Sequence, residues 1–434
     1  MFTKKLTRFS KIIIVLSFAV VCLSLAHTLH GPKAVSIDTS GQLDQTYITF
    51  QFNDILAPKQ TPDIHIEPST KFTASISDKQ LVLRFDEPLL YNNTYRVEVS
   101  NIHDRRGRVA SSSYRFHTGV QKIAYLQRGS EIDQIHTRIV GKPESDAVIF
   151  EHERIGDFAV STAGSVLAVI DENTKTMFTR LLRITDEKSE EITPPKGIAL
   201  AVTASATKNS FLIRTRDMAT LTNYLYRYDW QSNSFEELVK LDGSPIHASH
   251  VQFAPDGETI LYTDASDGLL YMLDPLAKRE PLNFGSVSSL CRVLSANKGI
   301  LIEPKPGQYQ LVQNNGEFKT ITEDITINEA TMTANGTFIY VTNAYSLTNP
   351  SQVVKLMNPS SEIKTVLTFD SSKELERSLQ LSPNDELISF NIGSVPNTYD
   401  GYRVRPEVRD SSIKIMTLNG QLIDNFSGTH LTWL

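Results

Sequence analysis

A short pattern of apolar and polar positions recurs through most of the chain, and its clearest copy begins at Val251. There an apolar run, Val251–Ala254, precedes Pro255-Asp256-Gly257, and a second apolar run covers Ile260–Asp264. Proline presets φ and glycine tolerates positive φ, so these three residues predict a tight turn between two strands. Ser266-Asp267-Gly268 predicts another turn before a third strand over Leu269–Leu273.

Copies of this pattern recur about every 40 to 50 residues, the period of four-stranded propeller blades. The paired apolar runs lie at 158–171, 200–215, 251–264, 290–304, 330–343 and 379–393. A third predicted strand follows each pair, at 177–184, 224–228, 269–273, 309–312, 353–357 and 413–418. A fourth is predicted at 235–241, 318–321 and 363–369. The sequence therefore predicts a β-propeller over residues 120–434.

The two ends of this region complement each other. His430–Leu434 has the pattern of a first strand with nothing after it, and Lys122–Gln127 that of a second strand with nothing before it. Pairing the two would complete a blade and remove the exposed strand edges of an open ring. With the six internal copies this predicts about seven blades, and six or eight stay open.

The turn residues also carry a family resemblance. Ala254-Pro255-Asp256-Gly257 and Ser382-Pro383-Asn384-Asp385 resemble the "S-P-D-G" turn of TolB-like (WD40-like) propeller repeats. The resemblance covers residues 120–434 and implies a fold. It implies no activity, because propellers of this kind include enzymes, scaffolds and pure binders.

Residues 34–119 predict a separate, smaller all-β domain. Seven short strand patterns separated by turn residues lie at 35–37, 47–52, 64–67, 72–76, 81–85, 95–99 and 114–117. Seven strands in so short a segment are typical of an immunoglobulin-like β-sandwich. No Cys…Trp…Cys core is present, so the domain is not of the antibody type.

Three motifs in residues 34–118 resemble the SbsA-type Ig-like domain of bacterial surface proteins. They are Pro88–Val99, Ile102–Gly107 and Tyr114–Gly119, in the family's order, with Arg108 where the family usually has Asn. We expect Tyr95 to pack inward and to bond its hydroxyl to the backbone near Leu90. Asp104 and Gly107 should set a hairpin turn. The domain would serve as a spacer or adhesion module, or as a purely mechanical stalk.

The first 33 residues have the pattern of an export signal. Lys4, Lys5, Arg8 and Lys11 precede the apolar run Ile12–Ala26. A basic segment before an apolar run is typical of secretory signals and places the body outside the cytoplasm. The run is either kept as a single membrane anchor or cleaved near Ala26. With Cys22 inside the run, Cys291 is alone in the body, so no intrachain disulfide framework is possible.

Charge excludes one class of partner. The formal net charge is −6, and residues 1–33 carry five basic and no acidic side chains, which leaves −11 for residues 34–434. Nucleic acid binding needs a net basic surface, so we expect no nucleic acid partner.

Motifs for chemistry are missing from the sequence. There is no G-x-S-x-G or H-E-x-x-H, and no paired-cysteine metal motif. We therefore predict no catalytic residue, no metal and no cofactor. Asp264–Gly268 could form a calcium loop, but a solvated turn is the simpler interpretation because further ligands are lacking.

One segment departs from the repeat. Residues 394–409, SVPNTYDGYRVRPEVR, separate the second and third strands of the last full blade, where other blades have shorter connections. They gather aromatic and arginine side chains in an acidic body, the usual composition of a binding hot spot. The candidate binding residues are Tyr399, Tyr402, Arg403, Arg405 and Arg409. The alternative is a long solvated loop. A second, weaker candidate is Tyr345–Pro350, the equivalent connection one blade earlier.

Together these features predict an exported all-β protein, an Ig-like module followed by a propeller, tethered to the membrane by its N-terminus. We expect a monomer that binds an extracellular or envelope protein or a surface polymer without catalysis. The alternative is a glycan-active hydrolase or lyase of the cell envelope.

Overall fold

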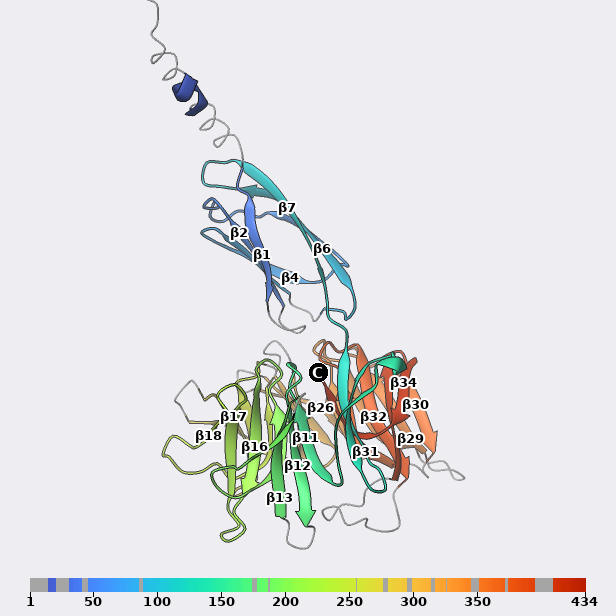
Figure 1. Ribbon diagram of the computed structural model, residues 1–434. Coiled ribbons are helices and arrows are strands. Elements are labelled where there is room, and N and C mark those ends of the chain that lie inside the picture. The colour runs from blue at the N-terminus through green and yellow to red at the C-terminus, as the bar shows by residue number, and fades with distance from the viewer. Residues whose placement is uncertain are drawn as a thin grey trace, which may run out of the picture. The chain divides into compact units, whose positions relative to one another are not determined.

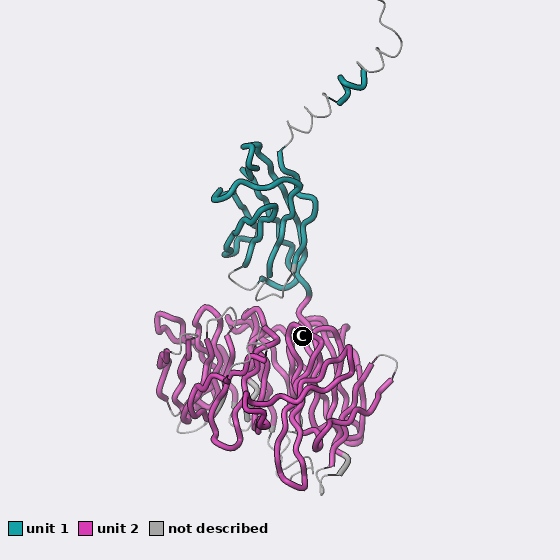
Figure 2. Tube along the Cα trace, turned by 90° about the vertical axis from the view of Figure 1, so that its left-hand side faces the viewer, with its two compact units in different colours: residues 1–119 teal, residues 120–434 magenta. Residues whose placement is uncertain are grey.

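The computed structural model contains two compact units, Met1–Gly119 (unit 1) and Val120–Leu434 (unit 2), which Figure 2 shows in different colours. It describes residues 15–20, 31–40, 46–85, 89–173, 178–185, 188–254, 256–275, 280–294, 299–313, 317–324, 326–344, 351–370, 374–394 and 409–434. Residues 15–20 are helical, and the remainder of the apolar run 12–26 lies outside the described residues. Within the described residues, no helix has the length and apolar character needed to span a membrane.

Unit 1 consists of two antiparallel sheets, ordered β1-β2-β5-β4 and β3-β6-β7. The strands are β1 (Ala34–Ser40), β2 (Tyr47–Phe52), β3 (Asp63–Glu67), β4 (Phe72–Ser77), β5 (Gln80–Phe85), β6 (Thr94–His103) and β7 (Val109–His117). Alternate residues of a strand face the same side, so Ile48, Phe50 and Phe52 of β2 are all buried. They share one core with residues of both sheets. All seven predicted strands are confirmed, as β1 to β7.

The predicted contact of Tyr95 is confirmed. The backbone N–H of Leu90 donates to the Tyr95 hydroxyl at 3.0 Å, and the side chain is buried. Tyr95 also stacks on Phe116 of the neighbouring strand, so its ring belongs to the core while its hydroxyl satisfies a backbone group.

The predicted turn at Asp104 is also confirmed. Asp104 Oδ1 accepts the backbone N–H groups of Arg106 and Arg108, both at 2.9 Å, and Gly107 has a φ of 76°. The Arg108 guanidinium forms ion pairs with Asp104 and with Asp54 at 3.1 Å. Arg108 therefore fixes the turn to the preceding loop.

Unit 2 consists of seven four-stranded antiparallel sheets, which we number as blades 1 to 7 (Figure 1). Blade 1 contains β35 (Thr429–Trp433), β8 (Lys122–Gln127), β9 (Asp133–Ile139) and β10 (Ala147–His152), with the short helix η1 (Pro143–Ser145) before β10. Blade 2 contains β11 (Ile155–Val160), β12 (Val166–Asn173), β13 (Phe178–Ile184) and β14 (Ser189–Ile192), and blade 3 contains β15 (Ile198–Ala204), β16 (Ser210–Arg216), β17 (Asn223–Asp229) and β18 (Ser234–Glu237).

The remaining blades follow in chain order. Blade 4 contains β19 (Ala248–Phe253), β20 (Ile260–Asp264), β21 (Leu269–Leu273) and β22 (Leu282–Ser286), and blade 5 contains β23 (Ser289–Val293), β24 (Ile300–Lys305), β25 (Gln308–Val312) and β26 (Phe318–Glu323). Blade 6 contains β27 (Ile327–Met332), β28 (Phe338–Ala344), β29 (Ser351–Met357) and β30 (Ile363–Asp370), and blade 7 contains β31 (Glu374–Leu381), β32 (Leu387–Ser394), β33 (Arg409–Thr417) and β34 (Leu422–Ser427). All six predicted strand pairs are confirmed as the first two strands of blades 2 to 7.

The blades form a closed ring. A separate hydrophobic core lies between each blade and the next, including one between blade 7 and blade 1. In β12, Val166, Ala168 and Ile170 pack against blade 1, whereas Leu167 and Val169 pack against blade 3. Burial on both faces explains why the second strands read as continuous apolar runs. Unit 2 is therefore a seven-bladed β-propeller.

The ring closes as the sequence predicts. β35, the last strand of the chain, pairs antiparallel with β8, the first strand of unit 2, with Thr432 opposite Ala124 and Trp433 opposite Ile123. The backbone N–H of Leu434 extends this pairing by donating to the carbonyl of Lys122 at 3.0 Å. The two ends of unit 2 thus complete one blade together.

Antiparallel order gives the propeller two distinct faces. Turns between first and second strands lie on one face, which we call the turn face. Connections between second and third strands, and the linkers between blades, lie on the other, which we call the linker face. First strands of neighbouring blades contact each other, as β11 does β15, so they surround the centre of the ring.

The glycine of the Pro-Asp-Gly turn is required by close packing between blades. Gly257 has a φ of 70°, and a Cβ there would lie 1.9 Å from the Thr207 hydroxyl oxygen of blade 3. Thr207 and Ser205 donate hydrogen bonds to the carbonyls of Asp256 and Gly257. The repeated turn therefore serves contacts between neighbouring blades.

One predicted element is shorter than expected. Residues 235–241 read as one strand, but β18 ends at Glu237. The chain then forms a separate turn, in which the N–H of Lys240 donates to the carbonyl of Ser244 and that of Gly243 to the carbonyl of Lys240. Apolar residues continue past the strand because this turn leaves Val239 and Leu241 on the surface.

Candidate functional site

The binding segment predicted from the sequence lies mostly outside the described residues. Tyr399, Tyr402, Arg403 and Arg405 all fall within 395–408. Arg409 is the first residue of β33, and its backbone is paired with Ser394, the last residue of β32. The structure therefore fixes the two ends of the segment and tests none of its side chains.

The position of this segment in the propeller follows from its ends. It joins the second and third strands of blade 7, so it starts and finishes on the linker face. Residues 395–408 separate β32 from β33, whereas the equivalent connections of the other six blades span two to six residues. The weaker candidate, 345–350, joins β28 to β29 of blade 6 and also lies outside the described residues. Both connections belong to the same face of adjacent blades.

Near the centre of the linker face, first strands carry bulges. Register shifts occur immediately before Asp157 in β11, Ala201 in β15, His250 in β19 and Glu329 in β27. A bulge breaks the regular pairing and redirects the side chain beside it. A fifth register shift lies immediately before Arg292 in β23, so the equivalent positions of these inner strands carry two acids, an arginine and an exposed histidine.

Both acids bind the neighbouring blade. Asp157 Oδ2 accepts the backbone N–H of Val202 in blade 3 at 3.0 Å. Glu329 Oε1 accepts the N–H of Leu379 in blade 7 at 2.9 Å. These bonds satisfy backbone groups of the adjacent first strand, so the two carboxylates act as links between blades.

The turn that could have been a calcium loop contains a buried ion pair. Asp264 is fully buried, and its carboxylate accepts from the Ser266 N–H at 2.9 Å and pairs with Lys240 Nζ at 2.9 Å. Burial alone would raise the pKa of Asp264, but the Ser266 hydrogen bonds and Lys240 hold it below its usual value. Asp267 instead accepts from the Tyr271 hydroxyl. Within the described ranges, no group of three or more His, Cys, Asp and Glu side chains is placed to hold a metal ion.

The residue equivalent to Asp264 fastens a linker in other blades too. Thr215 at the end of β16 donates its hydroxyl to the carbonyl of Lys196, in the linker that enters blade 3, at 2.8 Å. In blade 6 the hydroxyls of Thr342 and Thr326 lie 2.9 Å apart. A buried polar residue at the end of the second strand thus holds the incoming linker.

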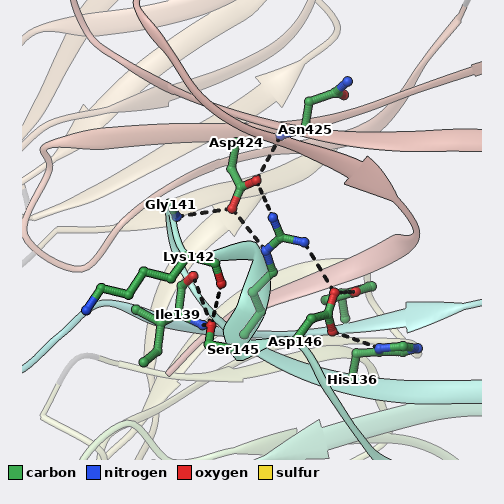
Figure 3. A network of polar contacts seen from close by, with 10 residues as sticks. His136, Ile139, Gly141, Lys142, Ser145, Asp146, Asp424 and Asn425 are labelled. Carbon is green, nitrogen blue, oxygen red and sulfur yellow. Dashed lines mark hydrogen bonds and ion pairs between the residues drawn. The ribbon is translucent and has the colours of Figure 1, made fainter.

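A dense buried charge network joins blades 1 and 7, as Figure 3 shows. Arg138 of β9 pairs with Asp424 of β34, with Nη2 2.6 Å from Oδ1, and its Nη1 lies 3.2 Å from Asp146 Oδ2. Asp146 also accepts from the Tyr125 hydroxyl at 2.6 Å and contacts His136 Nδ1 at 2.9 Å. The Arg138 guanidinium lies over the Phe426 ring, 4.7 Å from its centroid.

Both carboxylates of this network, Asp146 and Asp424, are engaged by several donors, which favours a structural role. Burial alone would raise the pKa of Asp146, but hydrogen bonds from Tyr125, His136 and Arg138 hold it below its usual value. Burial raises the pKa of Tyr125 well above its usual value. Asp424 accepts a further bond from the Gly141 N–H at 3.1 Å. Each carboxylate thus binds several donors across the joint where the ring closes.

Sequence reasoning missed the network because Arg138 and Asp424 are 286 positions apart. The available signal was local. His136 and Arg138 are polar residues two apart on a strand packed between blades, where apolar residues are the rule.

Comparisons with known proteins show limited similarity. No protein-family model matches the chain, and no curated protein matches it. A periplasmic gluconolactonase from Pseudomonas aeruginosa has 10% identity and a TM-score of 0.42, with 73% of this chain and 99% of that chain covered. TolB from Acinetobacter baumannii has 14% identity and a TM-score of 0.40, with 78% and 79% covered. A putative 6-phosphogluconolactonase from Bacteroides fragilis has 11% identity and a TM-score of 0.43, with 73% and 98% covered. Similarity at this level assigns no activity.

Proposed function

We propose that this protein is an exported, non-catalytic binding protein of the bacterial cell envelope. Its propeller would hold an envelope protein or a surface polymer through residues 394–409 on the linker face. The observation that supports this most directly is the length of this connection, residues 395–408 against two to six residues in the other blades. A regular ring gives no structural reason for such an extension, and its Tyr and Arg content suits a binding hot spot.

The N-terminal parts complete the proposal. Residues 12–26 would serve as a membrane anchor, or as a signal cleaved near Ala26. Unit 1 would be an SbsA-type Ig-like spacer, which the Tyr95–Leu90 bond and the Asp104 turn support. The body would then be displayed outside the cytoplasm.

Site-specific crosslinking tests the binding role. A photo-crosslinking amino acid would replace Tyr399 or Tyr402 in the full chain on intact cells, and the adducts would be separated by size. We expect discrete adducts at both positions, and their loss when Arg403→Gln and Arg405→Gln are added. Arg105→Gln and Arg106→Gln, exposed in the unit 1 turn, are the matched control. Adducts that survive the loop substitutions and disappear with the control would reject the proposal.

One structural observation bears against the alternative, a glycan-active hydrolase or lyase. An enzyme of this kind uses carboxylates free to transfer protons, whereas Asp157 and Glu329 near the ring centre bind backbone N–H groups. We expect the full chain to release neither reducing ends nor unsaturated sugars from isolated envelope polysaccharide. Release that is abolished by one conservative carboxylate substitution would favour the enzyme.

A further inference from the structure

Blade 3 exposes a group of large apolar side chains at one corner of the linker face. Met218 is 41% exposed, Leu221 58%, Val239 40% and Leu241 59%. We propose that these residues, the apolar corner, form a docking surface for a partner-protein segment with apolar side chains flanked by Lys or Arg. The surface lies on a different blade from residues 394–409, so it does not depend on that site.

Two segments at the same end of β17 form the corner. Residues 217–222 connect β16 to β17, and residues 238–245 follow β18. β17 and β18 pair with Tyr226 opposite Glu237, and the Leu238 N–H donates to the Leu225 carbonyl at 2.9 Å. The chain after β18 therefore continues along the start of β17, toward the 217–222 connection.

Hydrogen bonds fix both segments. The N–H of Asp217 donates to the carbonyl of Thr222 at 2.9 Å, and Asp217 Oδ1 accepts the N–H of Ala219 at 2.8 Å. In the second segment Val239 bridges to Pro245, and Asp242 Oδ1 accepts the N–H of Ser244 at 2.9 Å. A fixed surface loses little conformational entropy on binding.

The backbone of Leu221 is an outlier. Its φ is 58°, and a bulky residue in the left-handed region is strained. The strained backbone does not bury the side chain, because Leu221 has one of the most exposed apolar side chains among the described residues of the propeller. Strained positions concentrate at binding sites, and this one holds a leucine outward.

Charge selects the kind of partner. Asp217 and Asp242 are adjacent in sequence to Met218 and Leu241. Among the described residues no salt bridge is found for either carboxylate, although Lys240 acts electrostatically on Asp242. Two nearby cations pair with other acids, Lys196 with Glu237 and Lys240 with Asp264. An apolar surface with an acidic rim suits a basic, apolar segment. A second copy of this acidic chain or an anionic lipid surface would be repelled.

Peptide binding to the full chain in detergent micelles tests this inference, with protein-free micelles as the blank. The probes are short fluorescent peptides of equal length, one with Leu anchors and Lys/Arg flanks, one with Glu flanks and one with Ser anchors. Fluorescence anisotropy should show saturable binding of the first peptide only. Leu221→Ser with Leu241→Ser should weaken it about tenfold or more. Asp217→Asn with Asp242→Asn keeps the turn-forming oxygens and should weaken it severalfold.

The matched control is Phe318→Ser with Ile363→Ser, two side chains of blades 5 and 6 that are 54% and 58% exposed. It should leave binding unchanged. Equal binding of the Glu-flanked peptide, or equal loss in the control, would overturn the inference. So would a dimer in sedimentation that Leu221→Ser with Leu241→Ser disrupts, since the occupant would then be a second copy. Failure of residues 394–409 to bind a partner would leave this result unaffected.

Discussion

Arg138 illustrates how single residues hold the ring closed. It is 7% exposed and bridges two carboxylates, Asp424 of blade 7 and Asp146 of blade 1. A buried charge is tolerated because its partners and hydrogen bonds offset the loss of hydration. Removing one member leaves the others buried without compensation, so the network should be far more sensitive to single than to paired substitution.

Substituting Arg138→Met should lower the free energy of unfolding of unit 2 by about 3–5 kcal/mol, because Asp424 would be left buried and unpaired. Adding Asp424→Leu should recover part of the loss. Urea unfolding followed by tryptophan fluorescence measures this, since Trp230 and Trp433 are the only tryptophans and both belong to unit 2. Arg180→Met, at an exposed ion pair with Glu191, is the control and should cost less than about 1 kcal/mol. An equal effect of the two single substitutions would contradict this role.

In unit 1, Tyr95→Phe should weaken the domain by about 1 kcal/mol, the usual net value of one hydrogen bond. The Leu90 amide loses its acceptor, so its hydrogen exchange should become faster in the full chain. Tyr114→Phe removes a hydroxyl that contacts exposed Thr39 and should leave that amide unchanged. Unchanged exchange at Leu90 in Tyr95→Phe would show that the bond does not protect the amide.

At the scale of elements, closure depends on the pairing of β35 with β8. Thr432 and Ala124 are directly opposite partners. In a chain with Cys22→Ser and Cys291→Ser, Ala124→Cys with Thr432→Cys should form a disulfide on mild oxidation, because opposite residues bring their Cβ atoms close. Ala124→Cys with Trp433→Cys places the two side chains on opposite faces of the sheet. Crosslinking of this control as readily as of the first pair would contradict the register.

Strands and turns could be predicted from the sequence wherever a single physical cause, such as burial on both faces, produces a recognisable pattern of residues. Second strands are buried on both faces, so runs such as Val166–Ile170 stay apolar, and Pro and Gly mark the turns. Contacts between neighbouring blades could not be predicted. Nothing near Asp157 in the sequence shows that its carboxylate accepts the backbone N–H of Val202. For the binding segment, Tyr402 and Arg403 fit a hot spot and a solvated loop equally well by composition.

At the scale of the whole molecule, carboxylates whose pKa values are lowered by folding make stability depend on pH. Asp146 and Asp104 have pKa values lowered in the folded state because their hydrogen bonds outweigh the opposing effect of burial. A lowered pKa means that the stabilisation is present above the unfolded value of about 4 and is lost as pH falls through the folded value. Asp146→Asn should therefore be less stable at neutral pH and lose less stability on acidification. The free energy of unfolding of the natural chain and of Asp146→Asn would be measured by tryptophan fluorescence from pH 7 to about 3. Curves that run parallel over this range would contradict the prediction.

The central claim for the molecule is that a regular ring supplies the scaffold and that binding occurs where the chain departs from it, at residues 394–409. The most direct measurement is proximity labelling by the tagged full chain on intact cells. It compares the natural chain with one lacking residues 396–408 and with one carrying a Gly–Ser segment of equal length there. Tryptophan fluorescence should be alike in all three, since Trp433 packs in the core between blades 7 and 1 and reports whether that core is intact. We predict that both variants lose the partners labelled by the natural chain; an unchanged set of labelled partners in both would contradict the account.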